Sequence, residues 1–153
     1  RPRRVPADRR MQRGERDLAK KQYQEVLKIS PNFAPAANNL AWIMIEDEQP
    51  DLGEALRLAL TAKQALPEDA HIVDTRGMVH YKRGSFGLAR AEFAQAVEHR
   101  PDMPVFQYHL GMTYLAANQQ TEARQALERA LDLSKANPLP QEDRIREALK
   151  GIK

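Results

Sequence analysis

Small residues recur through this sequence at a fixed separation of 34 positions. The recurring pairs are Gly77 and Gly111, Ala89 and Ala123, Ala96 and Ala130, and the helix-ending Pro67 and Pro101. Between successive prolines, the apolar residues have the spacing of two helices joined by a short turn. A period of this length is typical of a solenoid, in which each helix pair buries its apolar face against the next pair. We therefore predict an all-α stack of helix pairs, because a closed bundle has no need of a fixed period.

Three positions in each unit must let two helices approach closely, and all of them carry glycine or alanine. They are Ala41, Ala55 and Ala62, then Gly77, Ala89 and Ala96, then Gly111, Ala123 and Ala130. Small side chains let helix axes come within about 8–10 Å of each other. Larger residues are expected to fill the space between helices, and these are Tyr81, Phe86, Phe93, Tyr114 and Leu127. A longer spacing between the first two small positions places a two-residue insertion near 48–51.

This combination of period and small residues resembles the tetratricopeptide repeat (TPR) family, and the sequence looks like part of a bacterial TPR protein. The resemblance implies a right-handed α-solenoid of about 3.5 repeats. Pro2 and Pro6 obstruct a helix at the start, and few apolar residues are found there. We expect an irregular Arg-rich segment over 1–13, the second helix of a partial repeat over 14–33, complete repeats over 34–67, 68–101 and 102–135, and a capping helix within 136–153.

Positive charge is concentrated at the start of the sequence. The net charge is +3, but residues 1–16 hold seven arginines against Asp8 and Glu15, a balance of +5, so the remainder carries −2. The Arg-rich segment is either a solvated tail or a site for an acidic partner or polyanion. The rest of the chain gives no electrostatic reason to expect nucleic acid.

The sequence lacks the residue patterns of the common catalytic and metal sites. It has no cysteine, and His71, His80, His99 and His109 do not have the spacing of metal ligands. The Gly-Ser-Phe-Gly stretch at 84–87 lacks the strand that a nucleophile elbow requires. No apolar run approaches the roughly 18 residues that span a bilayer, and no apolar signal core follows Arg1. We assign no enzymatic activity, cofactor, metal, small-molecule substrate or membrane insertion, and the compartment stays open.

The resemblance also implies a binding surface. In TPR proteins the first helices of successive repeats line a concave groove that holds peptides. The matching residues here are Asn38, Asn39, Trp42 and Glu46, then His71, Asp74, Thr75, Met78, Tyr81 and Lys82, then Tyr108, His109 and Met112, with Ile45, Val105 and Leu115 beside them. Trp42, Met78 and Met112 each follow the small residue of their helix. They are expected to form an apolar ladder for a partner, or alternatively to seal neighbouring helices together.

The expected function is protein–protein interaction, in which a module or adaptor holds a partner peptide or helix in this groove. The basic residues with which some TPR proteins clamp a C-terminal carboxylate are missing from it. As an alternative, the stretches 38–42 and 74–77 resemble long bacterial TPR proteins of envelope export and exopolysaccharide systems, in which this segment would be a scaffold. A second alternative is polyanion binding through the Arg-rich start. The incomplete first repeat could also expose an apolar edge and allow self-association.

Overall fold

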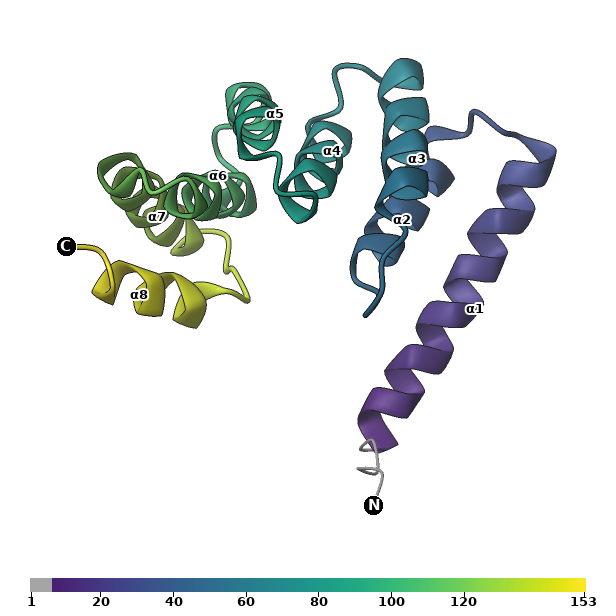
Figure 1. Cartoon of the computed structure of the whole chain (residues 1–153), viewed down its shortest axis with the longest axis horizontal. Helices are drawn as coiled ribbons and strands as arrows, with labels where there is room; N and C mark the ends of the chain where they lie inside the picture. Colours follow the sequence, from purple (N-terminus) through teal and green to yellow (C-terminus); the bar gives the residue numbers. More distant parts are fainter. Residues whose placement is uncertain (1–6) are drawn as a thin grey trace.

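The computed structural model describes residues 7–153, with the side chains of residues 12–153. This part of the chain contains α-helices and no strand. The helices are α1 (Ala7–Ile29), α2 (Ala34–Ile45), α3 (Leu52–Ala65), α4 (Ala70–Lys82), α5 (Phe86–His99), α6 (Pro104–Ala116), α7 (Gln120–Ser134) and α8 (Glu142–Lys150). They form a row of pairs, with α1 at one end and α8 at the other (Figure 1).

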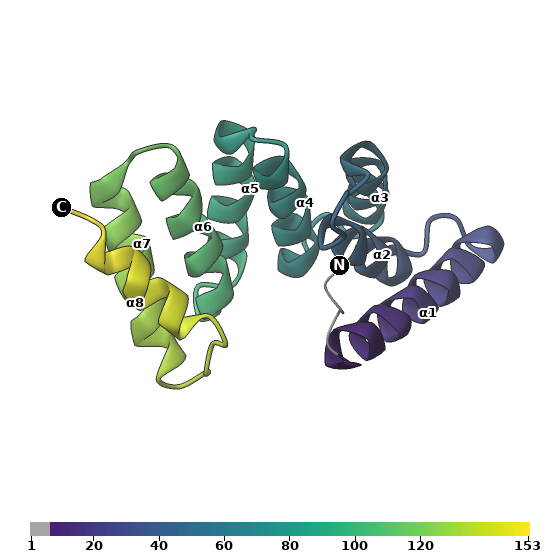
Figure 2. The ribbon, with the colours of Figure 1, turned by 60° about the horizontal axis from the view of Figure 1, so that its bottom comes forward.

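The packing follows the order of the chain. Each helix contacts the next one, and the first helices of successive pairs also meet, α2 with α4 and α4 with α6. Turned by 60°, the molecule is again an elongated row rather than a closed bundle (Figure 2). The predicted all-α solenoid is therefore confirmed, because contacts pass from each unit to its neighbour as in a linear array.

Glycine or alanine occupies every predicted close-approach position, and all nine of these residues are buried. The two glycines show why size matters. A methyl group at Gly77 would lie 2.6 Å from the ring of Phe93, and one at Gly111 would lie 2.7 Å from the side chain of Leu127. Atoms cannot approach so closely without displacement, so α4 and α6 need glycine at these crossings.

The turns inside two pairs use the left-handed backbone region. Gly84 between α4 and α5 has φ +77°, and Asn118 between α6 and α7 has φ +59°. Glycine has no Cβ to clash in this region, and asparagine tolerates it better than most residues. Asn118 stands 34 residues after Gly84, so it takes the place of glycine at the equivalent turn.

The start of α1 differs from the expectation. An irregular segment was expected over 1–13, but the helix begins at Ala7; residues 1–6 lie outside the described part. Proline directly before a helix is not disruptive, because the first helical amides have no partner within the helix. The Arg, Gln and Glu residues that follow are good helix formers, so an apolar face is not needed for this turn to be helical.

One side of α1 is less covered than the equivalent side of later helices. Val26 lies at the register position of Ala62, Ala96 and Ala130, which have no exposed surface. Val26 is 38% exposed, and Leu18 and Ile29 on the same helix are also exposed. This is the apolar edge anticipated from the incomplete first repeat, and self-association through it stays a prediction.

Helix α8 covers the other end of the row. Its Ile145 is fully buried, and Leu139 and Ile152 beside the helix join it in one cluster with residues of α6 and α7, including Leu127. Ile145 stands 34 residues after Gly111, so a branched side chain occupies the position that is small in each complete pair. The side chain fills space against α6 and α7 that would otherwise be an apolar surface open to water.

A charged cluster joins α3, α4 and α5 in the middle of the row. Glu92 Oε2 lies 3.2 Å from Lys63 Nζ, and Glu92 Oε1 lies 3.3 Å from Arg76 Nη1. The Glu92 side chain is only 12% exposed. Burial, and after it the positive charge of Arg76, lowers the pKa of the neighbouring His80. The neutral imidazole is thus favoured, which avoids a third cation beside one carboxylate.

Candidate functional site

The first helices of the three complete pairs, α2, α4 and α6, converge on one open pocket of about 260 Å³. Its lining consists of Asn38, Asn39, Trp42, His71, Asp74, Thr75, Val105 and His109. All of these residues are among those that the sequence predicts to line the groove. The helix register brings them together because the same face of each first helix points to the same side of the row.

Two buried side chains form the polar floor of this pocket. His109 Nδ1 donates a hydrogen bond to Asp74 Oδ1 over 2.7 Å, and each side chain is only 8% exposed. A carboxylate only accepts hydrogen bonds, so the shared proton belongs to Nδ1 of the imidazole. This bond ties α4 to α6 and fixes the orientation of the His109 ring.

Aromatic rings surround His109 on several sides. The ring centroids of Phe93, Tyr108 and Trp42 lie 5.3, 5.6 and 6.2 Å from the His109 centroid, all in tilted arrangements. These distances are in the range of favourable aromatic contacts. Trp42 is half-buried. One part of the Trp42 side chain therefore lines the pocket, and another part packs against the apolar cluster.

The two asparagines of α2 differ in how their polar atoms are satisfied. Asn39 Nδ2 donates a hydrogen bond of 3.4 Å to the Tyr23 hydroxyl of α1. Asn38 Oδ1 is buried and has no hydrogen-bond partner among the described residues. An unpaired buried acceptor costs free energy, so a bound group that donates a hydrogen bond here would be favoured.

The remaining predicted groove residues do not line this pocket. Met78 and Trp42 border the same apolar cluster of α2, α3 and α4, whereas Met112 packs with Tyr108 in the cluster that α8 covers. The continuous ladder of Trp42, Met78 and Met112 therefore stays a prediction.

Burial raises the pKa of Tyr81, whose ring lies edge-on to Phe86.

The last two predicted groove residues lie at the ends of their helices. Lys82 is exposed at the end of α4. Glu46 follows α2 and forms an ion pair of 3.7 Å with Arg16 of α1. Its carboxylate is therefore engaged in holding two helices together.

The Asp74–His109 pair is the element that sequence reasoning missed. The two residues are 35 positions apart, one more than the repeat, so they occupy neighbouring positions on adjacent first helices. The register could have indicated this neighbourhood. It could not show which polar side chains on facing helices touch.

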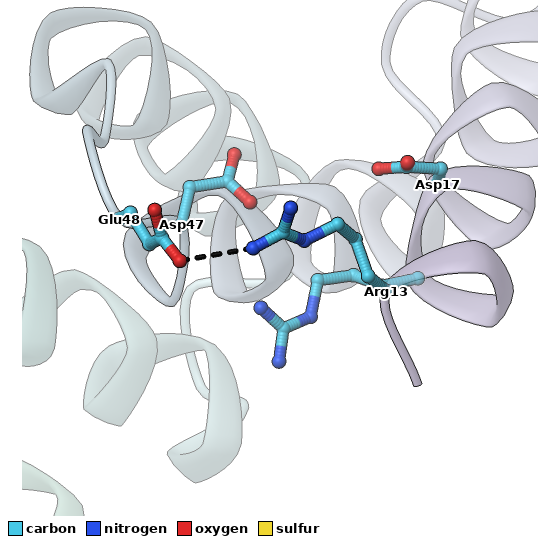
Figure 3. A pocket seen from close by; sticks show the side chains of 5 residues that line it. Arg13, Asp17, Asp47 and Glu48 are labelled. Carbon is cyan, nitrogen blue, oxygen red and sulfur yellow. Dashed lines mark hydrogen bonds and ion pairs between the residues drawn. The ribbon is translucent and has the colours of Figure 1, made fainter. Parts of the chain in front are cut away.

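A second pocket, of about 220 Å³, lies between α1 and the loop after α2 and is lined by charged residues. Figure 3 shows the Arg13 guanidinium reaching the Glu48 carboxylate, with Nη2 and Oε1 3.0 Å apart. Lys20 Nζ lies 3.2 Å from Asp47 Oδ2. The acidic loop that contains the two-residue insertion therefore holds the first half of α1.

These ion pairs bear on the polyanion alternative. Arg13 and Arg16 already pair with carboxylates of the α2–α3 loop. A polyanion would have to displace these carboxylates before it could bind the two arginines. The other five arginines of the Arg-rich start lie outside the side chains that the structure describes. Polyanion binding through them stays a prediction.

Salt is expected to loosen the first half of α1. Exposed ion pairs contribute about 0–1 kcal/mol each, and salt above about 0.5 M screens them over a few ångströms. Amides of residues 8–18 should therefore exchange several-fold faster in 0.5 M than in 0.05 M NaCl, measured by hydrogen exchange. Amides near Tyr23 and Leu27 should change little, because these side chains pack in an apolar cluster.

The matched control is the double variant Arg13→Gln, Arg16→Gln, which should exchange fast at both salt concentrations. Equal acceleration along the whole of α1 would show that the ion pairs do not hold the helix.

Among the described residues, no group of three or more His, Cys, Asp or Glu side chains is placed to hold a metal ion. No described helix combines the length and apolar character needed to cross a bilayer.

The fold and the pocket define a class: a helical repeat solenoid whose first helices share one open groove. Residues 75–138 match the tetratricopeptide repeat family. A TPR repeat-containing protein of Pseudomonas aeruginosa is 34% identical over 97 residues, which are 62% of this chain and 16% of that protein. Residues 75–138 therefore carry tetratricopeptide repeats, and the chain spans 16% of the length of this relative.

Solved structures share the fold at low sequence identity. A thermophilic TPR protein of Thermus thermophilus has a TM-score of 0.77 and 21% identity, over 92% of this chain and 76% of that chain. The TPR2B domain of yeast Sti1, in a complex with pHsp70, has a TM-score of 0.66 and 19% identity, over 74% of this chain and 94% of that chain.

Proposed function

We propose that this chain is an adaptor module that binds a peptide or helix of a partner protein in the groove of α2, α4 and α6. The observation that carries the proposal is the pocket between Trp42 and the Asp74–His109 pair, to which three successive repeats contribute. A groove built from several rigid helices can hold an extended or helical segment without rearranging. The role is one of binding, with no catalytic step assigned.

The chemistry of the groove supports a protein ligand. Trp42 offers a large half-buried apolar surface, and tryptophan is common at the energetic centres of interfaces. Asn38 and Asn39 supply amides, which can both donate to and accept from a peptide backbone. A scaffold role within a longer protein is the competing proposal, and it requires no affinity in this pocket.

Truncation of Trp42 is expected to weaken binding of any groove ligand. Peptides selected from a random displayed library on the intact chain should bind with roughly micromolar dissociation constants. Trp42→Ala should raise those constants by about tenfold or more, corresponding to about 1.4 kcal/mol. Trp42 is the single tryptophan, so its fluorescence reports occupancy directly in the wild type.

The control is Leu88→Ala, which removes a side chain that is 58% exposed on α5, outside the pocket lining. It should leave peptide affinity unchanged, and both variants should keep wild-type helicity by circular dichroism. Selected peptides that bind Trp42→Ala as tightly as wild type would remove the proposal and favour the scaffold role.

A further inference from the structure

We propose that the groove pocket receives an arginine side chain of the partner. This inference rests on the proposed function and makes it more specific: the ligand is a peptide or helix with an arginine whose guanidinium lies between Trp42 and Asp74. Three independent features of the pocket lead to this choice: its charge, an unused acceptor and an aromatic wall.

The charge of the pocket is negative. Asp74 is the one lining residue with a carboxylate, and neither lysine nor arginine lines the pocket. Among the described residues its side chain makes a single hydrogen bond, from His109. The Asp74 side chain is nearly buried, so little water competes for its free acceptor positions. A carboxylate offers about four acceptor positions, so Asp74 can accept from a cation while it holds His109.

A second acceptor lies in the lining of the same pocket. Asn38 Oδ1 is buried and has no hydrogen-bond partner in the described chain. A ligand that donates hydrogen bonds can satisfy this atom and Asp74 together. The guanidinium of arginine suits this task, because it carries five N–H donors in a planar fork and has no acceptor of its own. A carboxylate ligand would leave Asn38 Oδ1 unpaired and would face Asp74.

The third feature is the Trp42 ring at the edge of the pocket. Tryptophan is the best of the aromatic residues at attracting a cation over its face, and arginine is the more frequent partner. The volume of about 260 Å³ is below that of sites for drug-sized molecules but adequate for one long side chain. Acceptors on one side and an aromatic wall on the other match a flat cation.

The test compares two short peptides that differ in charge alone. The first is acetyl-Gly-Leu-Arg-Leu-Gly-amide, and in the second citrulline replaces the arginine with a neutral group of nearly the same shape. Titration is followed by Trp42 fluorescence and by the Trp42 indole and Asn38 amide resonances in NMR spectra. We expect the arginine peptide to bind at least about fivefold more tightly than the citrulline peptide.

Two variants change the pocket in opposite directions. Asn38→Asp adds a carboxylate at the unused acceptor and should tighten binding of the arginine peptide about fivefold. Asp74→Asn removes the charge with almost no change of shape and should reduce the arginine peptide to the affinity of the citrulline peptide. Glu122→Gln, an exposed charge on α7 outside the lining, is the control for net charge and should leave both affinities unchanged.

The outcomes separate this inference from the proposed function. Equal binding of both peptides, abolished in each case by Trp42→Ala, would overturn the arginine site and leave the groove function standing. Weaker binding of the arginine peptide to Asn38→Asp than to wild type would overturn the arginine site too, and that result does not depend on Asp74→Asn folding. If neither peptide perturbs a groove resonance at millimolar concentration while the library peptides still bind through Trp42, the arginine site again falls alone.

Discussion

Phe93→Ala is expected to lower the free energy of unfolding by about 3–5 kcal/mol. Phe93 is fully buried, and its ring fills the space that Gly77 leaves on α4. Removing the ring leaves a cavity at the crossing of α4 and α5, which the fixed register of the stack cannot close. Urea unfolding followed by circular dichroism measures the loss. Leu88→Ala on the same helix is the control and should change stability by less than about 0.5 kcal/mol.

The partner substitution tests the same crossing from the other side. Gly77→Ala should cost about 1–3 kcal/mol, because its methyl group would meet the Phe93 ring. The double variant should be more stable than the sum of the two single effects predicts, by about 1 kcal/mol or more. The chain contains a precedent, since Ala41 and Ala59 occupy the equivalent positions in the first complete repeat and both are buried. Additive effects would show that this crossing does not set the register.

Removal of the charge on Glu92 is expected to destabilise the middle of the row by about 2 kcal/mol. Breaking a fully buried pair costs about 3–5 kcal/mol, and the partial exposure of this cluster reduces that cost. The Lys63 and Arg76 side chains are 21% and 27% exposed, so both cations would remain half-buried beside each other. Glu92→Gln keeps the shape of the side chain and isolates the charge. Its midpoint of urea unfolding should fall, most strongly at low salt.

The same cluster should be replaceable by apolar residues without loss. The positions of Lys63, Arg76 and Glu92 recur 34 residues later as Val97, Leu110 and Ala126. A triple variant with Lys63→Val, Arg76→Leu and Glu92→Ala should therefore regain wild-type stability or exceed it, since apolar residues often match or better a buried ion pair. A triple variant less stable than Glu92→Gln would show that the cluster contributes more than its paired charges.

The 34-residue repeat could be predicted from the sequence because it depends on the size of single side chains at the helix crossings. A small residue such as Gly77 is required wherever two helices cross closely, so the crossings appear in the sequence as a period. The left-handed turn at Asn118 was predictable for a similar reason, because few residues tolerate it. Each of these features depends on one residue at a time, which a linear pattern can record.

Features that depend on two side chains meeting were harder to predict. The register places Asp74 and His109 on facing helices, but hydrogen bonding between them depends on rotamers that the sequence does not specify. The early start of α1 does not follow from apolar spacing, because these first turns are helical without an apolar face. The ion pair of Arg13 with Glu48 joins residues 35 positions apart and leaves no periodic trace.

The branched side chain at Ile145 has a consequence for protein engineering. A further helix pair could not be appended after α7 by duplicating a repeat and leaving α8 in place, because α8 already occupies the docking surface and has isoleucine where a crossing demands glycine or alanine. Lengthening the array would require glycine or alanine in place of Ile145, together with a new second helix. If α8 were fused after the last helix pair of another array, in contrast, it would cover the apolar surface at the end of that array.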